Sequence, residues 1–131
     1  MATNLVYPNV GTLSLPVLAG TVSGDPVRAG TTPTAVNGIN GVALTDRSGG
    51  LPANPTGYAT VATTGAFDVS VATNVAAAGA LAIGDVVYMD ALGVLSSDSV
   101  TAGQMAWGIA LEAKTAAGAA SVIIVAIIPS V

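Results

Sequence analysis

The sequence of 131 residues contains no cysteine and no histidine. Disulfide bonds are therefore impossible, and the side chains that most often bind zinc and copper are missing. Without histidine, nucleophilic catalysis of the Ser-His-Asp kind is also excluded. Only oxygen ligands remain, which suit calcium or magnesium, and no acidic run has the alternating spacing of a calcium-binding loop. We therefore expect no cofactor.

Charged residues are also few, at 8% of the chain against about 25% in typical soluble domains. The cations are Arg28, Arg47 and Lys114, and the formal net charge is −4. This balance removes the electrostatic basis for binding nucleic acid. Because 52% of the residues are hydrophobic, we expect part of the surface to be covered by another protein. The alternative is a surface rich in Ser, Thr, Asn and Gly.

Long apolar runs are missing as well. A membrane-spanning helix needs about 20 consecutive apolar residues, whereas the longest strong run here is residues 122–128, which ends at Pro129. The first residues lack the basic segment before an apolar one that marks a secretory signal. These features predict no membrane partner and synthesis in the cytosol.

The sequence does contain a motif that occurs twice, at residues 23–30 and 83–90. In each copy the second and third residues are a Gly-Asp pair, which favours a turn, and branched residues follow, which favour a strand. Residues 41–45 after the first copy match residues 108–112 after the second. The recurring Asp25 and Asp85 are either a catalytic pair or caps for the backbone of their turns, and we favour the caps.

Turn residues at close spacing and period-two alternation predict an all-β fold. We expect a compact single-domain β sandwich or barrel with two pseudo-repeated halves, at about residues 19–72 and 78–131. In this division, residues 66–71 close the first half and residues 121–128 close the second. Residues 1–18 are expected to form an extended N-terminal arm ahead of the β domain at residues 19–131.

Individual strands follow from the same patterns. Residues 58–63 and 67–71 are expected to pair across Thr64-Gly65, with Phe67, Val69 and Val71 facing the core. The arm contains a short strand at residues 12–15 that packs either on a neighbouring subunit or at an edge within the chain.

A strand at residues 106–113 should place Trp107, Ile109 and Leu111 on one face. Trp107 is expected in the core, and the alternative is a sugar-stacking platform with Tyr58.

The last strand, within residues 122–128, is apolar on both faces. Such a strand is either central in a sandwich or barrel, or buried on one side by another subunit. Because burying one large apolar side chain is worth about 1.5–3 kcal/mol, an exposed second face would be costly. The strand therefore predicts an oligomer, with a single-chain sandwich as the alternative.

Several motifs, in this order, resemble small tailed-bacteriophage capsid decoration proteins, also called cement proteins. The resemblance begins with Gly11-Thr12-Leu13-Ser14-Leu15-Pro16-Val17 and Ala19-Gly20-Thr21-Val22-Ser23-Gly24-Asp25-Pro26-Val27. It continues with Gly57-Tyr58-Ala59-Thr60-Val61-Ala62, Ile83-Gly84-Asp85-Val86-Val87-Tyr88 and Trp107-Gly108-Ile109-Ala110-Leu111-Glu112-Ala113-Lys114. Residues 31–41 fit the pattern poorly.

The resemblance implies a non-enzymatic virion protein that is made in the host cytoplasm and binds the outer capsid surface. Its implied partners are the major capsid protein and itself, as a homotrimer that clamps neighbouring capsomers. The candidate contacts are large or charged side chains of the arm, the turn-rich loop and the last strand: Leu5, Val6, Tyr7, Leu13, Leu15, Arg47, Leu51, Ile123, Val125 and Ile127.

Two alternatives from other classes remain at this point. One is a carbohydrate-binding β module of a phage fibre or surface appendage that uses Tyr58 and Trp107. The other is a small β-fold hydrolase in which Asp25 and Asp85 hold a divalent metal through oxygen ligands.

Overall fold

The computed structural model describes residues 11–30, 38–48, 54–72, 80–90, 92–97, 103–113 and 121–128. In these ranges the chain forms nine strands and no helix, so the predicted all-β fold is confirmed. The strands, in chain order, are β1 (Thr12–Pro16), β2 (Pro26–Ala29), β3 (Ile39–Ala43), β4 (Tyr58–Ala62), β5 (Ala66–Ala72), β6 (Val86–Met89), β7 (Leu95–Ser96), β8 (Met105–Ala110) and β9 (Ser121–Ile127).

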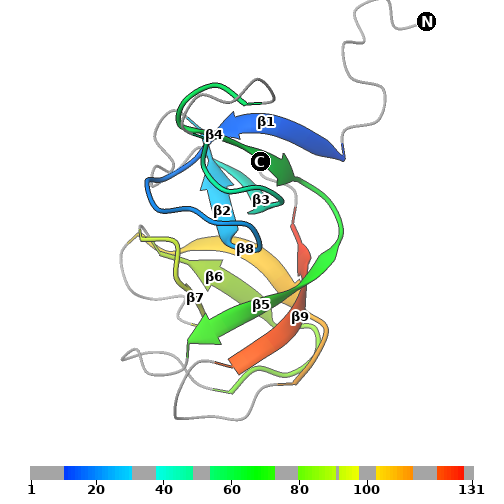
Figure 1. Cartoon of the computed structure of the whole chain (residues 1–131). Helices are drawn as coiled ribbons and strands as arrows, with labels where there is room; N and C mark the ends of the chain where they lie inside the picture. Colours follow the sequence, from blue (N-terminus) through cyan, green and yellow to red (C-terminus); the bar gives the residue numbers. More distant parts are fainter. Residues whose placement is uncertain are drawn as a thin grey trace, which may run out of the picture.

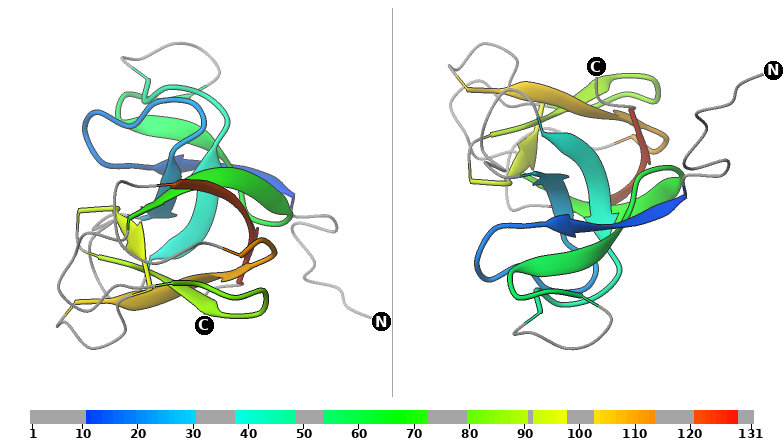
Figure 2. Two further views of the ribbon diagram at one scale, coloured as in Figure 1. Left: turned by 90° about the horizontal axis from the view of Figure 1, so that it is seen from below. Right: turned by 90° about the horizontal axis from the view of Figure 1, so that it is seen from above.

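The strands form two sheets that lie next to each other. One is a four-stranded sheet in the order β1-β4-β3-β2, and the other is a closed barrel in the order β5-β7-β6-β8-β9. Figure 1 shows the four-stranded sheet above the barrel, and Figure 2 shows the two from below and above. We call β1–β4 the first unit and β5–β9 the second unit.

The two units repeat one pairing scheme. In the first unit, β4 lies between β1 and β3, and β3 also pairs with β2. In the second, β9 lies between β5 and β8, and β8 also pairs with β6. All of these pairs are antiparallel. The two pseudo-repeated halves are therefore present, with β5 equivalent to β1 and β9 equivalent to β4.

The division between the halves differs from the expected one. The sequence places residues 66–72 at the end of the first half, whereas β5 is the first strand of the second unit. The predicted hairpin between β4 and β5 is also wrong, because neither strand pairs with the other. Gly65 has a φ of 113° in the connection between them, where the chain passes from one sheet to the other. A left-handed backbone of this kind favours glycine.

The edges of the two units are joined differently. In the second unit, β7 pairs in parallel with β5 and antiparallel with β6, and so closes the barrel. In the described part of the first unit, the edge strands are β1 and β2, and a backbone hydrogen bond links them. Gly30 N, just after β2, donates to Pro16 O of β1 at 3.0 Å. β1 is an edge strand within the chain, which was one of the two expected possibilities. The other arm residues, 1–10, lie outside the described ranges.

The apolar residues form two cores, one in the first unit and a larger one in the barrel, which Val42 of β3 also joins. Val69 and Val71 are buried and Phe67 packs against the barrel core, as the alternation in β5 predicts. Trp107 is fully buried in the same core. The predicted face of β8 does not hold, because Val87 pairs with Gly108 while Tyr88 pairs with Ala106. Trp107 is therefore the extra residue of a β-bulge, which disrupts the alternation of side chains along the strand.

Candidate functional site

Asp25 and Asp85 each hold the turn to which they belong. Oδ2 of Asp25 accepts a hydrogen bond from Val22 N at 3.0 Å, and Oδ2 of Asp85 accepts one from Ala82 N at 2.8 Å. The predicted role as backbone caps is confirmed. Because the two carboxylates are bonded within separate turns of separate units, this geometry gives no support to the metal-binding pair of the hydrolase hypothesis.

The glycines before these aspartates complete the same geometry. Gly24 and Gly84 both have a φ of 96°, in the left-handed region that glycine tolerates. Gly24 N donates to Ala43 O at 2.7 Å, and Gly84 N donates to Ala110 O at 2.8 Å. The repeated Gly-Asp motif thus ties each turn to the end of a neighbouring strand.

A buried polar network joins the two units. Arg28 of β2 donates from Nε to Asn40 Oδ1 at 3.2 Å and from an Nη atom to Ala106 O at 3.3 Å. Asn40 Nδ2 also donates to Ala106 O, at 3.1 Å. From the second unit, Trp107 Nε1 donates to Val27 O at 3.0 Å. These bonds satisfy carbonyl groups on both sides of the junction.

Sequence reasoning missed the role of Arg28 and Asn40. Both side chains are buried, and removal from water lowers the pKa of Arg28. One signal in the sequence could have indicated the role of Arg28: it is a cation placed between the apolar residues Val27 and Ala29 in a predicted strand. Gly38 also contributes, because a Cβ there would overlap the Arg28 side chain.

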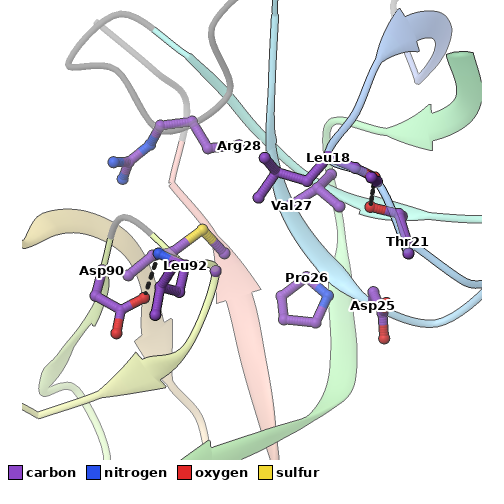
Figure 3. A pocket seen from close by; sticks show the side chains of 12 residues that line it. Leu18, Thr21, Asp25, Pro26, Val27, Arg28, Asp90 and Leu92 are labelled. Atoms are coloured by element: carbon purple, nitrogen blue, oxygen red, sulfur yellow. Dashed lines mark hydrogen bonds between the residues drawn. The ribbon is translucent and has the colours of Figure 1, made fainter. Parts of the chain in front are cut away.

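A cavity of about 260 Å³ lies beside the junction. Figure 3 shows Asp90 and Leu92 on one side of it and Leu18 and Thr21 on the other. Asp90 Oδ1 accepts a hydrogen bond from Leu92 N at 2.8 Å, and Thr21 Oγ1 donates to Leu18 O at 2.8 Å. These polar atoms therefore bind the local backbone, and the lining of the cavity is partly polar and partly apolar.

The structure separates the predicted contact residues on the strands. Leu13 and Leu15 in β1 are half-buried, and Leu15 packs against the first core. Ile123 and Val125 are buried in the barrel core, because the closed barrel surrounds that face of β9. They are core residues and do not form a surface contact. Ile127 is half-buried and packs against the same core.

The remaining candidates belong to the arm and the turn-rich loop. Arg47 is exposed, and its Nε donates to Val17 O at 3.1 Å, so it bonds to the first unit. Its guanidinium also lies against Gly57, which has a φ of 87°. The other predicted contacts lie outside the described residues: Leu5, Val6, Tyr7 and Leu51.

The expected core position of Trp107 is confirmed, and its burial excludes the alternative of a sugar-stacking platform. Trp107 has no exposed surface, and its indole nitrogen is bonded to a backbone carbonyl. Tyr58 is half-buried on β4. A sugar ring stacks on an accessible aromatic face, which Trp107 does not offer.

Across the described ranges, no group of three or more His, Cys, Asp or Glu side chains is placed to hold a metal ion. Among the same residues, no helix has the length and apolarity needed to cross a membrane.

Comparison with known proteins gives one result. A family model described as phage cement protein matches residues 8–127. No curated protein and no solved structure matches the chain. The matched residues include all nine described strands, so the match covers both units and the network that joins them.

Proposed function

Because the chain belongs to the phage cement protein family, we propose that it binds the outer surface of an assembled phage head and stabilises the junctions between capsomers. Membership of this family gives a structural role associated with the capsid. The family match over residues 8–127 is the observation that carries the proposal. No catalytic residue is assigned.

The proposed mechanism is mechanical. A protein that binds two neighbouring capsomers adds buried apolar surface that must be exposed again before the capsomers separate. Many such contacts around a shell act together, so each can be weak while the whole is strong. The low content of charged residues, 8% of the chain, favours contacts of this apolar kind.

We propose the major capsid protein and further copies of the chain, as a homotrimer, as the partners. The edge strand β1 supports this proposal, because an extended segment of a partner can pair with such an edge. The proposed contacts come from the arm, β1, the turn-rich loop and the end of β9: Leu5, Val6, Tyr7, Leu13, Leu15, Arg47, Leu51 and Ile127.

The test compares heads assembled without this chain before and after addition of the purified protein. We expect the protein to bind the heads at a fixed ratio to the capsid protein and to raise the temperature at which they rupture. Electron microscopy gives the position of the bound protein, and sedimentation of the free protein gives its oligomeric state. Failure of the purified chain to bind heads would contradict the proposal.

A further inference from the structure

The end of the second unit exposes three large apolar side chains. Ile83 is 69% exposed, Leu111 is 44% exposed and Val122 is 65% exposed. Gly84 N donates to Ala110 O at 2.8 Å, which places the turn containing Ile83 beside Leu111. In Figure 1, residues 80–85 and residues 111–113 lie at the lower end of the barrel, and β9 also begins at that end. We call Ile83, Leu111 and Val122 the apolar end.

Hydrogen bonds connect this turn region to the outer face of β9. Leu111 N donates to Ile124 O at 2.8 Å, and Ile124 N donates to Glu112 Oε2 at 3.1 Å. Val122 and Ile124 are two residues apart and therefore share a face of the strand. That face is the outer one, because Ile123 between them is buried in the core.

The first unit provides an internal reference for this region. Leu44 N donates to Thr60 O at 2.7 Å, which is the bond equivalent to that of Leu111, and Leu44 is 43% exposed. The position before the turn glycine is Ser23, where the second unit has Ile83. Ser23 N donates to Asp46 Oδ1 at 2.8 Å, and Ser23 Oγ donates to Leu44 O at 3.0 Å.

The equivalent ends therefore differ in chemistry while sharing a backbone. The first end carries Ser23, which is hydrogen-bonded within its own unit. The second carries Ile83 at the equivalent position, and this large apolar side chain is 69% exposed. The first end also exposes Val22 (50%) and Leu44 (43%), but it has a serine in place of the isoleucine, so the second end is the more apolar of the two. A larger exposed apolar surface is typical of an interaction site.

Three acidic side chains belong to the segments that form the apolar end. Asp68 of β5 pairs with Ile124 across the strands, Asp85 belongs to the turn of Ile83, and Glu112 follows Leu111. All three are exposed. A partner that buries the apolar centre therefore gains electrostatic energy if it carries lysine or arginine at the rim.

We propose that the apolar end docks an apolar segment of the capsid protein that is flanked by lysine or arginine side chains. This inference rests on the proposed function and names the surface and the partner's chemistry. A second copy of the chain is a poorer match, because each copy brings seven acidic residues and three basic ones. Of those three, Arg28 is buried at the junction, Arg47 is bonded to Val17 O, and Lys114 lies outside the described residues.

The test uses a matched pair of variants, Leu111→Ser and Leu44→Ser, at equivalent and equally exposed positions. Full-length variants are added to heads that lack this protein, and bound protein is measured against concentration. We expect Leu111→Ser to weaken binding about tenfold or more, because it loses one buried leucine at the contact. Leu44→Ser should bind within about twofold of the parent, since it removes a similar exposed area away from the contact.

A charge variant tests the partner's chemistry. Asp68→Asn should weaken binding and reduce its dependence on salt concentration, because it removes one charge from the rim. Equal binding by the parent and by both leucine variants would overturn the inference and leave the proposed function standing. Failure of the parent protein to bind would instead overturn the proposed function. If Leu111→Ser dissociates the oligomer during sedimentation and binds heads normally, the apolar end is a contact between copies and the inference is wrong.

Discussion

Two glycines allow strands of each unit to approach closely. At Gly41, a Cβ atom would lie 2.6 Å from Ala62 O and would overlap the side chain of Val61. At Gly108, it would lie 2.7 Å from Ala126 O and would overlap Val125. Since Ala62 O and Ala126 O belong to the backbone, relief of either overlap requires a strand to move.

We therefore expect Gly108→Ala to lower the free energy of unfolding by about 1–3 kcal/mol, as is typical when a methyl group is forced into a packed site. Gly11→Ala is the matched control, because a Cβ at Gly11 meets nothing within 4 Å. Urea unfolding of both variants gives the comparison. Equal stability of Gly108→Ala and the parent would contradict the close approach.

Residues whose role is local could be predicted from the sequence, and residues with distant partners could not. Asp25 bonds three residues away, so a Gly-Asp turn signal was sufficient to predict its role. Asn40 bonds to Ala106, which lies 66 residues along the chain. No local pattern specifies such a partner, and the junction therefore emerged only from the structure.

At the scale of elements, strand identity was easier to predict than strand pairing. The alternation in β5 correctly placed Val69 and Val71 in the core. The same signal does not say which strand pairs with it, and the short Thr64-Gly65 connection suggested β4. In the structure, β5 pairs with β9 and β7, because those contacts close the barrel. The apolar inner face of β9 has the same explanation, since the barrel buries it without a second subunit.

Deletion of residues 1–10 tests the proposed role of the arm. Because the described sheet begins with β1 at Thr12, we expect this deletion to leave the thermal unfolding midpoint unchanged and to lower occupancy on heads severalfold. Deletion of residues 1–16 is the control, since it also removes β1 and exposes the edge of β4. That larger deletion should lower the midpoint. Normal occupancy after deletion of residues 1–10 would contradict a contact by the arm.

At the scale of the whole molecule, the proposed clamp can transmit force between capsomers only if its two units stay together. The junction supplies buried hydrogen bonds from Arg28, Asn40 and Trp107, and each carbonyl that loses its donor would cost about 1–3 kcal/mol. Asn40 has the central position, because Nδ2 donates to Ala106 O at 3.1 Å and to Ile128 O at 3.0 Å. The network therefore couples the stability of one unit to that of the other.

Asn40→Leu removes these donors while keeping a side chain of similar size. We expect the parent to unfold in a single transition in urea and the variant to unfold the two units separately. Trp107 is the only tryptophan and lies in the barrel, so its fluorescence follows the second unit, whereas far-UV circular dichroism follows both. Transitions that no longer coincide show that the units have separated.

Because Asn40 is buried away from the apolar end, the Asn40→Leu variant should still bind heads. Those heads should nevertheless rupture at a lower temperature than heads carrying the parent protein. Equal rupture temperatures with the two proteins would show that the junction does not contribute to stabilisation of the head.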